Sequence, residues 1–167
     1  MPSSTRVGIQ ECNCLAVRQA ARRITQLYDQ YLAPAGLRTT QFAILAKLKR
    51  LGPLTINALA NELVMDRTTL GRTMLPLERD GLISIEDGTL DRRSKELRLT
   101  KAGAERLRVA RSLWSEAQKQ FEAAFGGKRA LTLRNELRAV ASSNLGVAPE
   151  ADKKTHSRKS ARAIHRP

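Results

Sequence analysis

Two short stretches of alternating apolar and polar residues, 82–86 and 96–100, stand in a chain whose other apolar residues recur every three or four positions. Strict alternation predicts a half-buried strand, whereas spacing by threes and fours predicts a helix with one buried face. A polar loop, 87–95, separates the two alternating stretches, as in a β-hairpin. The pattern therefore predicts a mainly α fold with a small two-stranded β hairpin.

Capping residues and helix breakers set the expected helix boundaries. A first helix runs from residue 12 to 32, before a proline and a glycine, and a last helix follows Gly126-Gly127 and ends near residue 145. Ser, Thr, Asp and Asn are the preferred residues at helix N-termini. The expected caps of the four helices in between are Thr39 or Thr40, Thr55, Asp66 and Thr100.

The two short helices that begin after Thr55 and Asp66 are separated by a tight turn, which is typical of a helix-turn-helix. In the second of them, which is expected to run to Asp80, Pro76 removes a backbone donor and is expected to bend the last turn. Gly81 is expected to end it in the left-handed conformation. Its inward stripe is predicted to be Leu70, Met74 and Leu77, with Arg67, Thr68, Thr69 and Arg72 on the other side.

Charge favours a polyanionic partner. The 167 residues contain 30 Lys and Arg against 16 Asp and Glu, for a net charge of +14. A basic excess of this size is typical of proteins that meet phosphate-rich surfaces. The excess is spread along the chain, so an argument for DNA binding depends on where particular arginines lie. Residues 1–9 are expected to be a flexible head and 146–167 a disordered basic tail.

Several functional classes find no support in the sequence. It contains no run of about 18 to 20 uncharged apolar residues and no signal-peptide core, so a cytoplasmic protein without a membrane segment is expected. Two cysteines, Cys12 and Cys14, and two histidines, His156 and His165 in the polar tail, cannot assemble a zinc site. With no catalytic triad and no glycine-rich phosphate loop, we expect no metal, no cofactor and no enzymatic activity.

A helix-turn-helix followed by a two-stranded wing suits double-stranded DNA. Short hydroxyl side chains at Thr68 and Thr69 allow the helix to approach bases and backbone closely. Arg72 is long enough for a bidentate contact to guanine, worth about 1 to 3 kcal/mol of discrimination. Arg67 is expected to contact phosphate, and Thr55 begins a helix whose backbone amides can face phosphate.

The hairpin loop carries three cations within four residues, Arg92, Arg93 and Lys95. A basic loop of this kind can enter a narrow minor groove, whose negative potential attracts arginine. The alternative interpretation is an ordinary solvated charged loop. Asp91 is placed to orient a neighbouring arginine by ion pairing.

Three blocks of residues carry a family resemblance. They are Met65–Arg72, then Leu77–Ile83, then Asp91-x-Arg93 followed by Leu99-Thr100-x-x-Gly103. In order and spacing they resemble the MarR family of winged helix-turn-helix transcriptional regulators, over about residues 10–145. The resemblance implies a winged helix-turn-helix (helix-turn-helix about 55–80, wing 82–100) embedded between dimerisation helices at about 11–33 and 101–145.

The resemblance also implies function. It implies a homodimer on a near-palindromic operator, with recognition-helix contacts at Thr68, Thr69 and Arg72 and a minor-groove contact at Arg93. The first helix and the last two carry more apolar residues than one small winged domain can cover, which independently favours dimerisation. These apolar residues are Leu15, Ile24, Leu27 and Tyr31 in the first helix, and Trp114, Phe121, Leu133 and Val140 in the last two.

Members of this family release DNA when a small anionic or aromatic ligand enters a cleft beside the dimerisation helices, or when a cysteine near the first helix is oxidised. The candidate ligand-cleft residues are the aromatic Tyr28, Tyr31, Phe42 and Trp114, with Arg18, Arg22 or Arg23 as carboxylate partners. Aromatic residues at helical spacing are also typical of an ordinary core, which is the alternative.

For oxidation, Cys14 lies where peroxide-sensing members hold their reactive cysteine, and Tyr28 has the spacing of one accompanying tyrosine. Arg18 stands where a second tyrosine is expected, which is a departure from that pattern. Cys12 and Cys14 lie on different sides of a helix, so they are not expected to bond to each other, and both can also be structural thiols.

The sequence thus predicts a sequence-specific DNA-binding regulator, a repressor released by a small ligand. The alternatives are a peroxide sensor using Cys14 and a nonspecific architectural DNA-binding protein.

Overall fold

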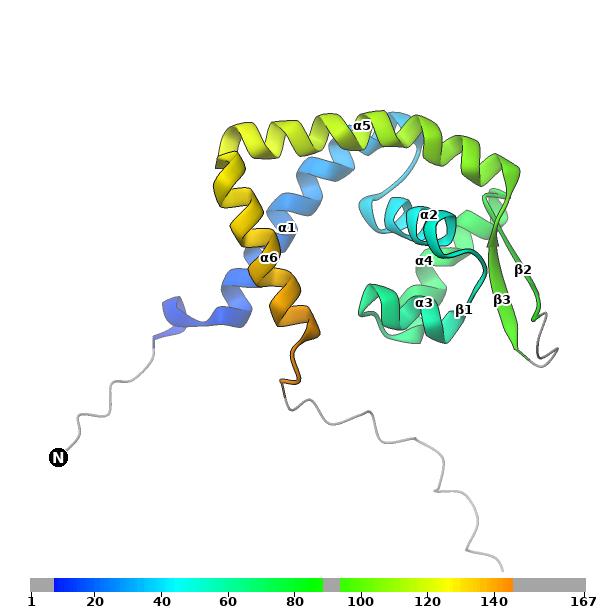
Figure 1. The fold of residues 1–167 in the computed structure, drawn as a ribbon, viewed down its shortest axis with the longest axis horizontal. Helices are drawn as coiled ribbons and strands as arrows, with labels where there is room; N and C mark the ends of the chain where they lie inside the picture. Colours follow the sequence, from blue (N-terminus) through cyan, green and yellow to red (C-terminus); the bar gives the residue numbers. More distant parts are fainter. Residues whose placement is uncertain (1–7, 89–93, 146–167) are drawn as a thin grey trace, which may run out of the picture.

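One long helix, α5 (Lys101–Phe125), links two parts of the molecule in the computed structural model, which describes residues 8–88 and 94–145 (Figure 1). One part, the helical arm, consists of α1 (Asn13–Leu32), α6 (Gly127–Ser142) and the C-terminal half of α5. The other part, the winged lobe, contains α2 (Thr39–Leu51), α3 (Ile56–Leu63), α4 (Arg67–Arg79) and a small sheet. Short 3-10 helices, η1 (Ile9–Glu11) and η2 (Ala33–Ala35), flank α1.

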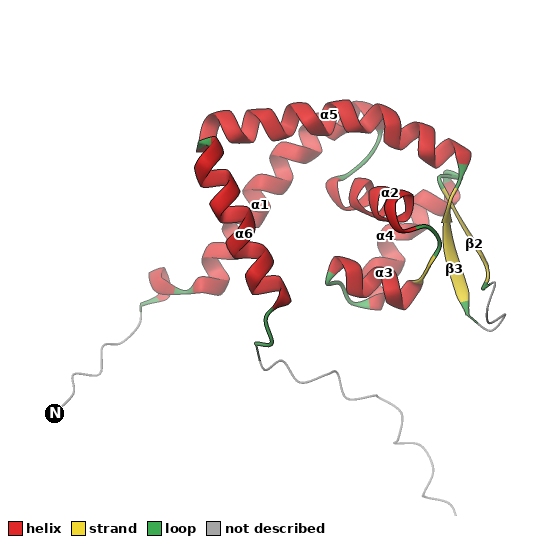
Figure 2. Ribbon diagram, viewed as in Figure 1, coloured by secondary structure: helices red, strands yellow, loops and turns green. Residues whose placement is uncertain are grey.

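The sheet has three antiparallel strands in the order β1-β3-β2 and lies at one end of a mainly helical molecule (Figure 2). The wing is formed by β2 (Ile83–Asp87) and β3 (Lys95–Leu99), which confirms the predicted hairpin. The two-residue β1 (Leu54–Thr55) was not predicted, because two residues are too few to show alternation. Leu97 of β3 pairs with Leu54 on one side and Ile85 on the other.

Three of the four predicted caps are confirmed. The side-chain oxygens of Thr55, Asp66 and Thr100 each accept a hydrogen bond from the backbone amide three residues later. Gly81 adopts the predicted left-handed conformation, with φ of 67°. Helix α4 continues through Pro76 to Arg79.

The prediction that Thr39 or Thr40 caps α2 was wrong. Arg38 is the residue that precedes this helix, and Thr39 is its first residue. The Asp29 carboxylate, from α1, accepts hydrogen bonds from the Thr39 amide and hydroxyl, both at 2.7 Å. Burial raises the pKa of Asp29, but the hydrogen bonds from Thr39 and Arg38 outweigh it and hold the pKa below its usual value. A side-chain acceptor at the start of α2 is therefore a carboxylate on α1 and not a threonine of α2 itself.

The main core lies inside the winged lobe, where α2, α3, α4, the sheet and the start of α5 meet. Its largest fully buried side chains are Leu32, Ile44, Leu45, Leu59, Leu70, Leu77, Leu97 and Leu107. Gly103 allows α5 to lie directly on the wing, since a Cβ there would sit 2.0 Å from the Leu82 carbonyl oxygen. None of the helices in the described ranges is long and apolar enough to span a bilayer.

Candidate nucleic-acid interface

Helix α4 has one buried side and one exposed side, as the sequence predicted. Leu70, Met74 and Leu77 are buried in the lobe core. Arg67, Thr68, Thr69 and Arg72 are all exposed. Neither Arg67 nor Arg72 forms an ion pair with any residue in the described ranges, so both guanidinium groups are available to a ligand.

Thr69 has a role in the free protein that the sequence did not reveal. Its hydroxyl donates a 2.6 Å hydrogen bond to Asp66 Oδ2, while its amide donates to Asp66 Oδ1 at 2.8 Å. These bonds favour the ionised carboxylate and lower the pKa of Asp66. The Thr69 hydroxyl proton is therefore already in use, and this side chain can offer a ligand an acceptor without breaking the cap.

The turn before α4 sets the direction in which that helix leaves α3. Val64 ends α3 in the left-handed conformation, with φ of 51°, and its side chain is exposed. The Met65 amide donates to the Ala60 carbonyl at 2.9 Å, closing the end of α3. A β-branched residue at positive φ is uncommon, so the surrounding structure must hold this turn in place.

Thr55 links the start of α3 to the end of β3 that lies next to the hairpin loop. It pairs with Glu96 across β1 and β3, and its hydroxyl accepts from the Ala58 amide at 3.2 Å. The first turn of α3 is consequently anchored beside β3. That the backbone amides of this turn contact phosphate stays a prediction.

The wing carries ion pairs along its length. Lys95 Nζ contacts Asp87 Oδ1 at 2.5 Å, directly across the hairpin. Arg98, which sequence reasoning did not single out, contacts Glu86 at 3.1 Å and Glu96 at 2.9 Å. Lys95 must therefore leave Asp87 to reach a phosphate. The predicted contacts at Arg92 and Arg93, and Asp91 beside them, lie outside the described residues.

Comparison with known proteins identifies this architecture. The MarR family model matches residues 37–95, which run from just before α2 to the first residue of β3. The transcriptional regulator MosR of M. tuberculosis is 33% identical, over 81% of this chain and 100% of that protein, with a TM-score of 0.69. The chain belongs to the MarR family.

Two further comparisons extend the assignment. A MosR structure in complex with DNA shares 35% identity over 78% of this chain and 94% of that one, with a TM-score of 0.70. The uncharacterized HTH-type transcriptional regulator YwoH of Bacillus subtilis (strain 168) is 33% identical over 85 residues, and the match spans 61% of its length. MarR-family proteins are DNA-binding transcriptional regulators and not enzymes.

The aromatic residues predicted for a MarR-type ligand cleft are largely engaged with other side chains. Phe42 is 9% exposed and stacks on Trp114 of α5, with 5.9 Å between ring centroids. Tyr28 is buried and its hydroxyl donates to Gln118 Oε1 at 2.5 Å. Tyr31 is half-buried, and Arg18 and Arg22 are exposed on α1. The structure thus brings Phe42 and Trp114 of the predicted set into contact.

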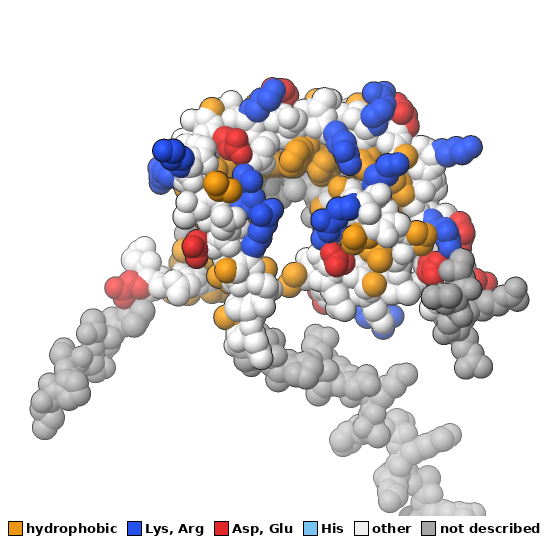
Figure 3. Space-filling view, viewed as in Figure 1, with side chains coloured by type: hydrophobic (Ala, Val, Ile, Leu, Met, Phe, Trp, Pro, Cys, Tyr) orange, Lys and Arg blue, Asp and Glu red, His pale blue; other side chains and the backbone are white. Residues whose placement is uncertain are grey.

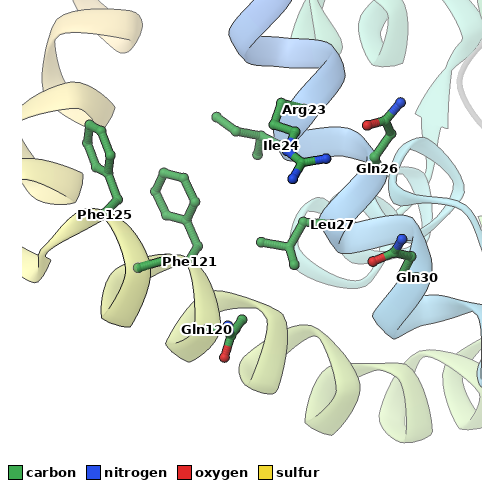
Figure 4. A pocket seen from close by; sticks show the side chains of 9 residues that line it. Arg23, Ile24, Gln26, Leu27, Gln30, Gln120, Phe121 and Phe125 are labelled. Atoms are coloured by element: carbon green, nitrogen blue, oxygen red, sulfur yellow. The ribbon is translucent and has the colours of Figure 1, made fainter.

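A pocket of about 430 Å³ lies instead between α1 and α5, within the helical arm. Figure 4 shows the Phe121 and Phe125 rings of α5 facing Ile24 and Leu27 of α1. Arg23 also lines this pocket, and it alone comes from the predicted set. No sequence signal could have located it, because it depends on how the two helices cross.

The two cysteines lie at the start of α1. Cys12 Sγ accepts a hydrogen bond from the Leu15 amide at 3.4 Å, while Cys14 is exposed, and both thiols are free. Tyr28 lies fourteen positions after Cys14 on the same helix, which corresponds to about 21 Å along the axis. Within one chain, the structure therefore does not bring these two side chains together.

Proposed function

We propose that this protein is a homodimeric repressor that binds a near-palindromic operator and leaves it when a small aromatic or anionic ligand binds. The observation that carries the proposal is the exposed front of α4, where Thr68, Arg67 and Arg72 project from a helix whose other side is buried. The MosR complex with DNA supports it, because that chain is similar over 94% of its length.

The proposed DNA contacts divide by their chemistry. Thr68, Thr69 and Arg72 read base edges from the major groove, where Arg pairs best with guanine. The remaining contacts fix position on the phosphate backbone or in the minor groove. These are Thr55, Arg67, Arg92, Arg93 and Lys95.

Dimerisation through the helical arm is supported by its exposed apolar side chains. Large apolar patches on a protein surface mark interaction sites. The exposed apolar residues of α1, α6 and the C-terminal half of α5 are Leu15, Val17, Trp114, Leu131, Leu137 and Val140. We accordingly assign residues 10–145 to one winged unit with dimerisation helices at about 11–33 and 101–145, with residues 1–9 and 146–167 as head and tail. A solution mass equal to one subunit at working concentrations would contradict this part of the proposal.

Ligand release follows from two half-sites at a fixed separation. Two winged lobes bind together only when their spacing matches the operator. A ligand that binds a different spacing more tightly shifts the population away from DNA. Calorimetric binding of aromatic acids, followed by their effect on operator affinity, tests this step.

The central experiment selects bound duplexes from a random pool and then compares variants on the selected operator. We expect Arg72→Ala to lose about 1 to 3 kcal/mol on the cognate site, roughly 5- to 150-fold in Kd. Arg93→Ala should weaken operator and random duplex to a similar extent. Arg79→Ala, at the opposite end of α4 and ion-paired to Asp80, is the matched control and should change little. If Arg72→Ala and Arg93→Ala both bind as the parent does, the assigned surface is wrong.

A nonspecific architectural role predicts a different result in the same assay. Such a protein binds operator and random duplex almost equally, with a steep dependence on salt. A sequence-specific regulator keeps a large ratio between the two affinities at physiological salt. Measuring both affinities across a range of salt concentrations separates the two roles.

Thiol oxidation is the second candidate trigger, because the Cys14 side chain is exposed in the first turn of α1. Peroxide should then release DNA from the parent and not from Cys14→Ser. Cys12→Ser is the matched control, since that thiol accepts a hydrogen bond from the Leu15 amide. Equal release from the parent and Cys14→Ser would eliminate this trigger.

A further inference from the structure

A groove runs between the C-terminal end of α2 and the first three turns of α5. It consists of two adjoining cavities of about 480 and 350 Å³, which share Lys49, Lys101 and Ala104. The groove lies where β3 meets α5, at the end of the wing opposite to its hairpin loop. It is separate from the pocket between α1 and α5, with which it shares no lining residue.

The floor of the groove is apolar. Leu48 of α2 and Leu107 of α5 are each 2% exposed and form its base, and Ala104 lies between the two cavities. Figure 3 shows hydrophobic side chains lying between Lys and Arg side chains where α2 meets α5. A volume of about 480 Å³ falls in the range of small-molecule sites, which are commonly about 300 to 1,000 Å³.

The rim of the groove is positively charged. Lys101, Arg108 and Arg111 follow one stripe of α5, and Lys49 lies across from them on α2. Glu105 is the one carboxylate lining the larger cavity, and Arg108 already binds it at 2.6 Å.

Arg98, which lines the smaller cavity, pairs with Glu86 and Glu96, whereas three other cations of the groove have no acidic partner among the residues that the structure describes. Lys49, Lys101 and Arg111 form no ion pair with residues 8–88 or 94–145. Lys101 is also the first residue of a 25-residue helix, whose N-terminal end adds positive potential. An apolar floor beneath unpaired cations is complementary to a molecule with an apolar body and an anionic head.

We infer that this groove binds a small amphipathic carboxylate. Its apolar part lies on Ala104 and Leu107, and its carboxylate contacts Lys49, Lys101 and Arg111. The span of α5 from residue 101 to 111 is about 15 Å, which suits a medium-length chain or an aromatic acid rather than a folded domain. The ligand would bridge α2, which lies in the winged lobe, and α5, which continues into the arm. The regulatory role of this ligand therefore rests on the proposed function, whereas its binding to the groove does not.

Calorimetry on the full chain without DNA tests the site, with octanoate as the probe. Octanol lacks the charge and acetate lacks the apolar chain, so we expect each to bind at least tenfold more weakly than octanoate. Octanol binding as tightly as octanoate would overturn the inference, as would no octanoate binding at millimolar concentration. Binding of an acidic peptide to these residues, with none of octanoate, would assign the groove to a protein partner and also overturn it.

Substitutions in the groove test where octanoate binds on the protein. The double change Lys49→Gln with Arg111→Gln should weaken octanoate at least tenfold, and Ala104→Phe should do the same by filling the floor without altering charge. Lys119→Gln is the matched control, because Lys119 is exposed farther along α5 and pairs with Glu116. Far-UV circular dichroism confirms that each variant folds. Unchanged octanoate binding in both groove variants would place the ligand elsewhere.

The failure of this inference and the failure of the proposed function are distinguishable. Octanoate binding that depends on Lys49 and Arg111 supports the groove even if the random pool yields no operator, a result that would count against the regulator alone. Conversely, the selection could yield a well-defined operator while octanoate binding is unchanged by the substitutions at Lys49 and Arg111. That result would contradict the groove as the binding site but not the proposed regulator.

Discussion

Replacing Gly103 with alanine is expected to force α5 away from the wing. The added Cβ would lie 2.0 Å from the Leu82 carbonyl oxygen and 2.8 Å from Leu99 Cδ1, whereas ordinary contact begins at 3.4 Å. The nearest obstacle is backbone, so no change of side-chain rotamer relieves it, and the helix must move by about 1.4 Å, the difference between 3.4 and 2.0 Å. That movement also strains the bonds from Thr100 to the Gly81 and Leu82 carbonyls.

Two opposing effects set the size of the change in unfolding free energy that Gly103→Ala causes. Overpacking a core costs about 1 to 3 kcal/mol and sometimes more, and a clash with backbone belongs at the upper end of that range. Alanine gains about 1 kcal/mol over glycine in helix propensity. We therefore expect Gly103→Ala to lower the free energy of unfolding by about 2 kcal/mol, which lowers Tm by roughly 4 to 8 °C for a chain of this size.

Gly71→Ala is the matched control. Gly71 is also helical, within α4, but a Cβ there meets no atom within 4 Å. The control should gain up to about 1 kcal/mol from propensity. Urea unfolding followed by far-UV circular dichroism, at one protein concentration for every variant, measures both changes. A Gly103→Ala variant as stable as the parent would refute the packing argument.

Two further perturbations address the contacts between helices. Asp29→Asn should be less stable than the parent at pH 7, because the fold lowers the pKa of Asp29. The ionised carboxylate stabilises the fold at pH values above the unfolded pKa of about 3.9. That stabilisation is lost as the pH falls through the lower pKa of the folded state. Urea unfolding at pH 7 and pH 3 should therefore show a smaller difference between the two proteins at pH 3, and a constant difference would contradict the assigned role. Tyr28→Phe removes the hydrogen bond to Gln118 and should cost about 0.5 to 1.5 kcal/mol of unfolding free energy, whereas Tyr31→Phe, at a half-buried position, should cost less.

Local signals in the sequence were sufficient for much of the fold. Thr55, Asp66 and Thr100 cap their helices because each needs only an amide three residues away. The buried side of α4 follows from helical spacing alone. The wing follows from alternation, and Gly81 from the conformational freedom of glycine at a helix end.

Features that depend on distant parts of the chain could not be predicted in this way. Asp29 caps α2 from ten residues upstream, on a different helix. The strand β1 exists only because β3 offers it a partner. The sequence placed Phe42 and Trp114 in one candidate ligand cleft, but only the packing of α2 on α5 shows that they stack on each other. The groove beside Lys49 likewise requires both helices to be in place.

The continuity of α5 has a mechanical consequence. The helix runs unbroken from Lys101 to Phe125 and contains no proline, so it behaves as a single rod shared by the arm and the lobe. Its 25 residues extend about 37 Å, and a tilt of about 5° at one end would displace the other by roughly 3 Å. That displacement is close to the rise of about 3.4 Å between successive base pairs. A small rotation among the apolar contacts of the arm would thus shift the lobe-side end of α5 by a distance close to one base-pair step.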